Sequence, residues 1–218
     1  MDIEQIKTAL NESNPQQRMK GVRELRNYEA DIAVPLLLNH VTDKEFIVRS
    51  FVAMGLGRKQ SDAAFAALLT MINHDQDPNV RAEAANSLSF YGEVAVSHLR
   101  DMYEQDEHWL VRRSIIAVIT DFNRPQELLE ICKIGLLGED EPVMESCLSA
   151  LGLLAHTKQE TAALQLLLSW AEDKSWRIRL QVAKSLGQYD HPSAIAILSK
   201  LKTDQDHRVV GAVLESMI

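Results

Sequence analysis

Apolar residues recur along this chain in short helical patterns, and one of these patterns returns at a nearly fixed interval. It is clearest in the segment DPNVRAEAANSLSFYG at residues 77–92, where a Val-Arg pair precedes small residues, a Leu and a Gly. Aligned on Arg81, the matching positions are Arg18, Arg49, Arg81, Arg112, Met144, Arg179 and Val210. The steps between them are 31, 32, 31, 32, 35 and 31 residues. Self-similarity at such a period is the sequence signature of a repeat protein.

Around the aligned position, apolar residues follow a helical spacing. The residue just before it is apolar in all repeats except the first, and so are the residues four and seven positions after it in every repeat. These offsets lie on one face of an α-helix. The residues seven positions after are Leu25, Leu56, Leu88, Ile119, Leu151, Leu186 and Met217. Each repeat is therefore predicted to contain a helix with one apolar stripe, which we call its second helix.

A further apolar segment precedes the second helix in every repeat, from DIEQIKTAL near the start to SAIAILSKL near the end. Sustained alternation of apolar and polar residues is missing, so no β-structure is expected. One helix pair cannot bury its stripe, whereas stacked pairs can. The sequence therefore predicts an all-α fold: a single right-handed α-solenoid over residues 1–218, with about 14 helices. Its seven repeats have approximate boundaries 1–28, 29–58, 59–91, 92–122, 123–156, 157–189 and 190–218.

An Asp stands six positions before the aligned Arg in four repeats. The pairs are Asp43 with Arg49, Asp75 with Arg81, Asp106 with Arg112, and Asp173 with Arg179. In repeat 5 both members are replaced, by Gly138 and Met144. Because the Arg points toward the apolar stripe, its charge must be paired and hydrogen-bonded. We expect each acid to pair with the Arg of its own repeat, tying turn to helix, and the pairs to form a structural ladder along the stack. The alternative is a row of charges that bind a ligand.

These residues resemble the HEAT repeat. The Asp-x5-Arg spacing matches it, and Pro35, eight residues before Asp43, gives repeat 2 a further mark of that family. The compact form DPNVRAEAANSL, with a period near 31, is most similar to the short HEAT-like repeats of phycobilisome lyases and their relatives. The resemblance covers nearly the whole chain. It indicates architecture more than function, because such repeats serve many unrelated functions.

In solenoids of this family the second helices line the concave face, and function is expected where repeats depart from the consensus. Opposite the stripe, repeats 1 and 6 are mostly polar, but repeat 2 is apolar. The predicted apolar patch is Ile47, Phe51, Met54, Phe90 and Leu110, edged by Arg58, Asn86 and Arg113. Exposed apolar patches with polar rims mark interaction sites. The alternative is that curvature, or packing against the first repeat, buries these residues.

Aromatic residues begin three of the second helices. Phe46, Trp109 and Trp176 each stand three positions before the aligned residue. They are suited to stacking on a partner or a flat ligand, or equally to filling gaps between repeats. Trp109 and Trp176 therefore join the predicted partner-binding residues.

Two further departures concern length and the end of the chain. The 35-residue step places extra residues near LLAHTKQE, as a functional kink or as a longer turn. The last repeat ends at VLESMI with no polar cap, although terminal repeats usually have a polar outer face. This predicts self-association through the last repeat, or a chain cut from a longer protein.

Composition and charge limit the function further. The chain is 46% hydrophobic and 25% charged, as is usual for a soluble globular protein. A net charge of −8 argues against a nucleic-acid partner. No segment has the apolar length needed to span a bilayer, and the N-terminus does not resemble a secretory signal. Cys132 and Cys147 lie among apolar residues, as expected for core thiols in a reducing compartment. The predicted location is cytoplasmic.

The sequence predicts no catalytic residue, metal site or cofactor. None of the seven histidines is followed by Glu, whereas deoxyhypusine hydroxylase, a HEAT-repeat enzyme, looks to hold its iron through repeated His-Glu pairs, so we expect no such site here. HEAT-like alkylpurine glycosylases need a basic groove with Trp, Asp and Arg. Trp109, Arg112 and Arg113 resemble that set, but the net charge argues against it. Phycobilin lyases attach open-chain tetrapyrroles to phycobiliproteins, usually as two-protein complexes, and no strong catalytic constellation is expected of them.

Two functions remain open at this point. The first is a non-enzymatic scaffold or adaptor that binds a protein partner in its concave groove. The alternative is an accessory subunit of the phycobilin lyase type, which binds a tetrapyrrole and a phycobiliprotein. If the chain is part of an enzyme, the activity implied by the resemblance is lyase-type chromophore attachment or detachment.

Overall fold

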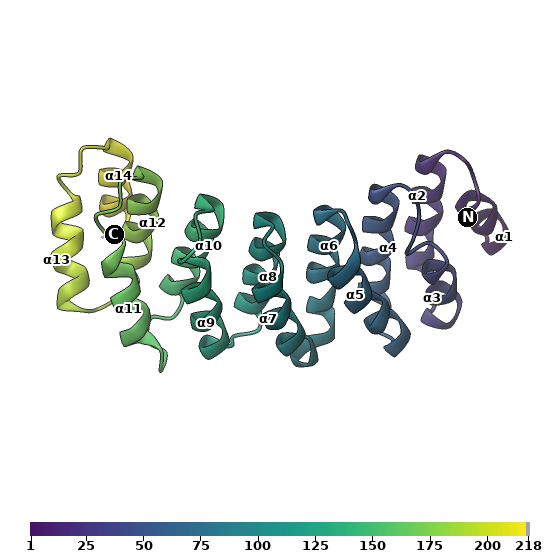
Figure 1. Ribbon diagram of the computed structural model, residues 1–218, viewed down its shortest axis with the longest axis horizontal. Coiled ribbons are helices and arrows are strands. Elements are labelled where there is room, and N and C mark those ends of the chain that lie inside the picture. Colours follow the sequence, from purple (N-terminus) through teal and green to yellow (C-terminus); the bar gives the residue numbers. More distant parts are fainter. Residues whose placement is uncertain (217–218) are drawn as a thin grey trace. The chain divides into compact units, whose positions relative to one another are not determined.

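The computed structural model describes residues 1–216, and every regular element within them is a helix (Figure 1). In each repeat, the helix that precedes the second helix is its first helix. The first helices are α1 (Ile3–Leu10), α3 (Ala30–Leu38), α5 (Asp62–His74), α7 (Val96–Gln105), α9 (Pro125–Gly135), α11 (Glu160–Ser169) and α13 (Pro192–Leu201). The second helices are α2 (Pro15–Glu24), α4 (Phe46–Lys59), α6 (Pro78–Leu88), α8 (Trp109–Asp121), α10 (Glu141–Gly152), α12 (Trp176–Leu186) and α14 (His207–Glu215). Short 3-10 helices follow α2 and α6, namely η1 (Leu25–Asn27) and η2 (Ser89–Ala95). The predicted all-α solenoid of helix pairs is confirmed.

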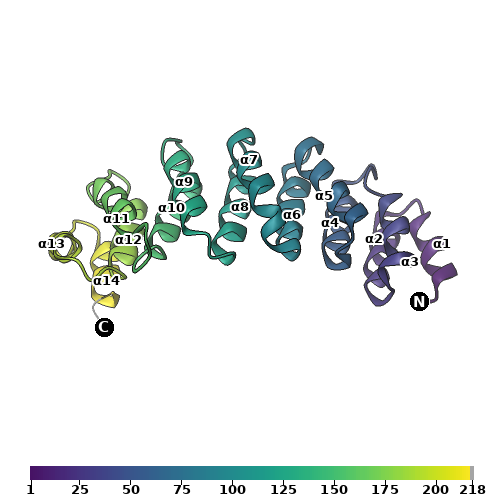
Figure 2. The ribbon, with the colours of Figure 1, turned by 90° about the horizontal axis from the view of Figure 1, so that it is seen from below.

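The chain divides into two compact units, Met1–Val118 and Ile119–Ile218, with the boundary inside α8. Within each unit the first helices form one layer and the second helices another (Figure 2). In the first unit α4 packs between α2 and α6. In the second unit α12 packs between α10 and α14. Neighbouring second helices therefore form the continuous contact within each unit.

The predicted apolar stripe forms the core. Val48, Val80, Val143, Ile178 and Val209, which precede the aligned position, are all at most 1% exposed. Leu56, Leu88, Ile119, Leu151 and Leu186 are fully buried. One position of the last repeat differs, because Leu214 is 55% exposed. Met217, the last predicted member of the stripe, lies outside the described residues.

Each second helix begins where the pattern places its first turn, three residues before the aligned position. Local chemistry explains these starts. The side chains of Asn14, Asp77 and Asp206 cap α2, α6 and α14 by accepting a backbone N–H two residues later. Pro15 and Pro78 stand at first-turn positions, where the missing N–H has no helical partner to lose.

A small-residue contact holds neighbouring second helices close together. Gly57 of α4 faces Ser87 of α6, and a Cβ at Gly57 would lie 2.7 Å from the Ser87 Cβ and 2.9 Å from its carbonyl oxygen. Gly152 meets Ser185 in the same way in the second unit, where a Cβ would lie 3.1 Å from the Ser185 Cα. Such close backbone approach needs glycine. This contact was not anticipated from the sequence.

The extra residues of the 35-residue step form a longer turn. They lie between the end of α10 at Gly152 and the start of α11 at Glu160. His156 adopts a left-handed backbone conformation with φ of 63°, and its N–H donates to the Glu160 carboxylate at 2.9 Å. The longer-turn alternative accounts for the step.

Candidate functional site

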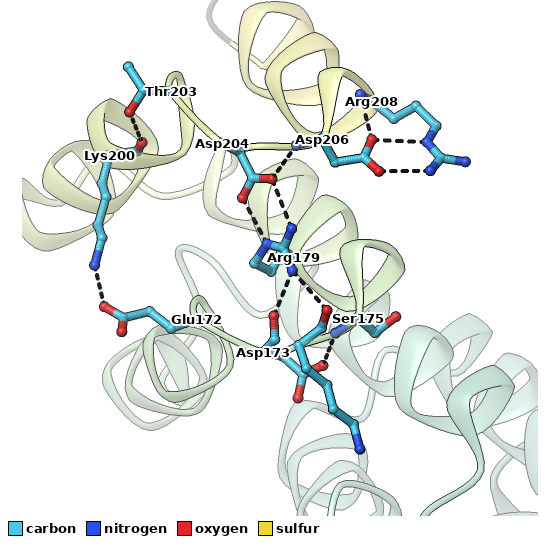
Figure 3. Close-up of polar contacts among 10 residues, drawn as sticks. Glu172, Asp173, Ser175, Arg179, Lys200, Thr203, Asp204, Asp206 and Arg208 are labelled. Carbon is cyan, nitrogen blue, oxygen red and sulfur yellow. Dashed lines mark hydrogen bonds and ion pairs between the residues drawn. The ribbon is translucent and has the colours of Figure 1, made fainter.

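The recurring Arg and Asp side chains form a ladder between successive repeats. The guanidinium of Arg18 donates through Nε and Nη2 to the Asp43 carboxylate at 2.7 and 2.8 Å. The same two-pronged contact joins Arg49 to Asp75, Arg81 to Asp106 and Arg179 to Asp204. Figure 3 shows the last of these rungs, with Arg179 held between Asp204 and the main chain of its own turn. Paired, charge-assisted hydrogen bonds of this kind are among the strongest in proteins.

The partner predicted for each Asp was wrong. The Arg six residues later bonds to the main-chain carbonyl of the Asp, as Arg49 Nη1 does to Asp43 O at 2.8 Å, and not to its carboxylate. The carboxylate instead faces the preceding repeat. It also accepts the backbone N–H two residues on, from Glu45 to Asp43 at 3.0 Å. Asp43, Asp75, Asp106 and Asp204 therefore each shape their own turn and receive the Arg of the repeat before.

The ladder satisfies its own charges. Burial acts to raise the pKa of Asp43, but hydrogen bonds from Arg18 and from the Glu45 N–H outweigh it, so the pKa is lowered. The hydrogen bonds from Arg179 likewise lower the pKa of Asp204, against the effect of burial. In the Arg18–Asp43 rung, the side chains are only 7% and 6% exposed. Charges so buried and so fully paired support the structural interpretation over a row of ligand-binding groups.

Repeat 5 lacks both residues, and the pairing across repeats shows that this removes two different rungs. Gly138 has no carboxylate to offer Arg112, which donates Nε to Asp106 O at 2.7 Å and lies over the Tyr103 ring at 5.4 Å. Met144 is buried where repeats 1–4 and 6 have Arg. The Asp173 carboxylate still accepts the Ser175 N–H at 2.7 Å and so retains the hydrogen bond within its own turn.

A cavity of about 170 Å³ opens between α2 and α4. It brings together three residues of the predicted patch, Phe51, Met54 and Arg58. Phe51 and Met54 are half-buried, whereas Arg58 is exposed. The remaining lining residues are Val22, Arg23, Leu25, Arg26, Leu37, Gly55 and Lys59.

The other predicted patch residues lie outside this cavity. Ile47 and Phe90 are 39% and 49% exposed, and Leu110 is half-buried. The predicted rim residues Asn86 and Arg113 are exposed. Packing against the first repeat thus partly covers one side of the predicted patch, while Ile47 and Phe90 remain open on α4 and after α6.

The aromatic residues that begin the second helices fall into two groups. Phe46 and Trp109 are 42% and 39% exposed, and Arg113 lies 5.7 Å from the Trp109 ring. Trp176 is instead covered by the next repeat, with the Arg208 guanidinium 3.2 Å from its ring centroid. Asp206 holds Arg208 through two hydrogen bonds at 2.9 and 2.7 Å. For Trp176 the structure favours the gap-filling alternative.

Sequence reasoning missed the cationic rim of the cavity. Arg23, Arg26 and Lys59 line it together with Arg58. Arg23 occupies the same repeat position as Met54, five after the aligned residue, so the pattern did contain the signal. The sequence pattern indicates only that the side of repeat 1 opposite the stripe is polar. It does not show that the cations of repeat 1 lie next to the apolar side chains of repeat 2.

Among residues 1–216, no group of three or more His, Cys, Asp or Glu side chains is placed to hold a metal ion. Cys132 and Cys147 are both buried thiols, and the hydrogen bond with Cys147 together with burial raises the pKa of Cys132. Within the same residues, every helix is too short or too polar to cross a bilayer.

Comparison with known proteins gives the family and the fold. A model of HEAT repeats matches residues 34–120 and 129–218. Deoxyhypusine hydroxylase-B of Oryza sativa subsp. japonica is 30% identical over 117 residues, which are 52% of this chain and 39% of that protein. The chain therefore spans well under half the length of this curated relative.

Two solved structures share the architecture over the whole chain. The X-ray structure of YIBA_ECOLI has a TM-score of 0.63 at 16% identity and is covered over 92% of its length. The complex of CpcE and CpcF of phycocyanin lyase from Nostoc sp. PCC7120 has a TM-score of 0.54 at 16% identity, with 95% covered. At this identity the likeness shows the fold alone. With the repeat model matching most of the sequence and the helix pairs stacked as described, the chain belongs to the HEAT-repeat family.

Proposed function

We propose that this chain is a non-enzymatic adaptor that binds a protein partner along the exposed side of its second helices in the first unit. The observation that carries the proposal is the exposure of Phe90 and Ile47, at 49% and 39%, in the unit that also holds a cavity lined by Phe51 and Met54. Large apolar side chains at the surface, next to a concave site with a polar rim, are the usual anchors of protein interfaces.

The second unit supports the proposal by contrast. On α12 and just after it, the corresponding positions are mostly polar, as on an ordinary solvated helix face: Arg177, Leu180, Gln181, Lys184 and Gln188. The repeat itself therefore does not require apolar residues on this side. Exposed apolar residues on this side are a property of particular repeats: Ile47 and Phe90 in the first unit, and Leu153, 60% exposed at the repeat position of Phe90, in the second.

The remaining features are consistent with an adaptor. The ladder charges bind one another, so they are not free to bind a ligand. The buried thiols Cys132 and Cys147 support a reducing, cytoplasmic location. Self-association through the last repeat stays a prediction, with Leu214 exposed there.

The test is affinity capture of the tagged chain from lysate of its source cells, compared with an Ile47→Ser/Phe90→Ser variant. We expect one protein to be enriched by the wild type and lost with the variant. The matched control is Ile195→Ser, which removes a 60% exposed apolar side chain from α13, in the layer of first helices. Equal retention by all three proteins would refute the proposed surface.

The absorbance spectrum of the same eluate distinguishes the alternative. A phycobilin lyase-type subunit would retain phycobiliprotein subunits and a visible tetrapyrrole band. The likeness to the CpcE and CpcF complex concerns the fold alone, so the adaptor function is preferred and a colourless eluate is expected.

A further inference from the structure

The cavity between α2 and α4 combines an apolar floor with a cationic rim. Leu37, Phe51 and Met54 contribute to the floor. Arg23, Arg26, Arg58 and Lys59 line the same cavity from the ends of the two second helices and from η1. Four cations around one small cavity stand out in a chain whose net charge is −8.

Lys59 is the one of these cations that the fold itself uses. Its Nζ donates to the main-chain carbonyls of Arg26, at 3.0 Å, and of Tyr28. These bonds tie the end of α4 to the turn that follows α2. Lys59 therefore shapes the rim, while its charge remains next to the cavity.

The three arginines are available to a partner. Among residues 1–216, none of Arg23, Arg26 and Arg58 makes an ion pair. The carboxyl groups near them are Glu24 and Glu83. Glu24 is already bonded to the N-terminal ammonium at 3.2 Å. Burial raises the pKa of Glu83, and the charge of Arg58 offsets only part of that effect. The rim thus carries an excess of positive charge.

The size of the cavity limits what enters it. At about 170 Å³ it lies well below the roughly 300–1,000 Å³ of pockets that enclose small-molecule ligands. A cavity of this size suits one large side chain supplied by a protein segment, in the manner of an interface anchor. Positive charge around such an anchor point favours acidic neighbours on the incoming segment and repels basic ones.

We propose that this cavity is the anchor point for an acidic segment of the partner protein. One large apolar side chain of that segment inserts beside Leu37, Phe51 and Met54, and flanking carboxylates pair with Arg23, Arg26 and Arg58. The inference rests on the proposed adaptor function, for which it states the chemistry of the partner.

The experiment measures fluorescence polarisation of short fluorescein-labelled peptides with the full chain. Four probes are compared: a central Leu with Asp and Glu flanks, the same peptide with Ala in place of Leu, a central Leu with Ser and Gln flanks, and a central Leu with Lys flanks. The acidic Leu peptide should bind about tenfold more tightly than each of the others, which corresponds to about 1.4 kcal/mol. Its affinity should fall as NaCl is raised, because the contacts at the rim are exposed to solvent.

Charge reversal provides the matched variants. Arg23→Glu/Arg58→Glu should weaken the acidic peptide about tenfold or more and improve the binding of the Lys-flanked peptide. The control Lys158→Glu/Lys202→Glu makes the same change in net charge at exposed positions of the second unit and should leave both affinities within about twofold. Both variants replace exposed side chains, and circular dichroism verifies that their folds are retained.

Two results would overturn the inference: an acidic peptide that binds no better than the neutral one, or an affinity that the Arg23/Arg58 reversal leaves unchanged. Either would leave the adaptor function standing if capture from lysate still depends on Ile47 and Phe90. Peptide binding as predicted, with capture indifferent to those two residues, would instead refute the adaptor surface and keep the anchor point.

Discussion

The two compact units are built from the same repeat but use it differently. In the first unit three Arg–Asp rungs join four successive repeats, through Asp43, Asp75 and Asp106. In the described part of the second unit, a single rung joins Arg179 to Asp204. The first unit exposes two large apolar side chains on this side, Ile47 and Phe90, whereas α12 of the second unit presents mostly polar residues and Leu153 is exposed after α10.

This comparison separates the residues that stabilise the stack of repeats from those that make its surface polar or apolar. Met144 shows that a buried apolar side chain can replace an Arg of the ladder, because ion pairs and well-packed apolar groups are alternative ways to fill such a site. Neither choice affects the opposite side of the helix, which is free to be polar or apolar.

The largest effect is expected from breaking a rung in the first unit. Arg81→Ala leaves the Asp106 carboxylate, 5% exposed, without its cation, and should lower the free energy of unfolding by about 3–5 kcal/mol. Arg113→Ala is the control, since it removes an exposed Arg and should change stability by less than about 0.5 kcal/mol. Urea unfolding followed by circular dichroism measures both. Similar losses for the two variants would contradict the structural role of the ladder.

The next effect concerns the contact between α4 and α6. Gly57→Ala places a Cβ within 3.0 Å of three Ser87 atoms, two of them main-chain, and should destabilise by about 1–3 kcal/mol through overpacking. Gly211→Ala is the matched control, because no atom lies within 4 Å of its Cβ position in α14. There the helix should gain about 0.5–1 kcal/mol. Thermal melts of both variants test the opposite signs.

A new rung in the second unit would sharpen the comparison. Met144→Arg supplies a cation to Asp173, so the two should become energetically coupled. A double-mutant cycle with Asp173→Ala should give a coupling of about 1–3 kcal/mol, although the net effect of Met144→Arg alone stays near zero. A coupling indistinguishable from zero would show that repeat 5 is not built to carry a rung.

Acid should lower the stability that the ladder contributes, over a range of pH. The folded-state pKa values of Asp43 and Asp204 are lowered from 3.8, so these carboxylates contribute stability above their unfolded pKa and lose it as the pH falls through the folded values. Stability should therefore be constant near neutrality and decline below about pH 4. Replacing the carboxyl in Asp43→Asn should flatten that decline. A midpoint of loss near pH 6 would instead implicate histidines.

The sequence predicted the architecture well because the same helix-pair pattern recurs in seven repeats. Each second helix starts where the aligned positions place it, and the apolar residues of the stripe are buried in repeats 1–6. A pattern that recurs at a fixed period can be recognised even where a single helix departs from it. In addition, each repeat contacts only its neighbours, so local contacts dominate the stack.

The partner of each Asp could not be settled from one repeat, because the Arg on either side lies within reach of the same turn. The last repeat did contain a clue. Asp204 has no Arg six residues later, since Val210 stands there, yet it is paired, with Arg179. An ion pair across repeats explains that acid, and it explains why one altered repeat removes two rungs.

The candidate site was predicted only in part. Periodicity identified the apolar departures on α4, but whether a side chain remains open depends on its neighbours in the adjacent repeat. Phe51 and Met54 are partly covered toward α2, and Trp176 is covered by Arg208. Such cover depends on three-dimensional packing between repeats, which the spacing of residues does not show.

Site-specific photo-crosslinking in the source cells tests the central claim most directly. A photoreactive benzoyl-phenylalanine replaces Phe90 in one variant and Ile195 in the other, at positions 49% and 60% exposed in the two units. The account predicts a discrete crosslinked partner from position 90 and none from position 195. The same product from both positions, or none from position 90, would contradict a partner-binding surface on the second helices of the first unit.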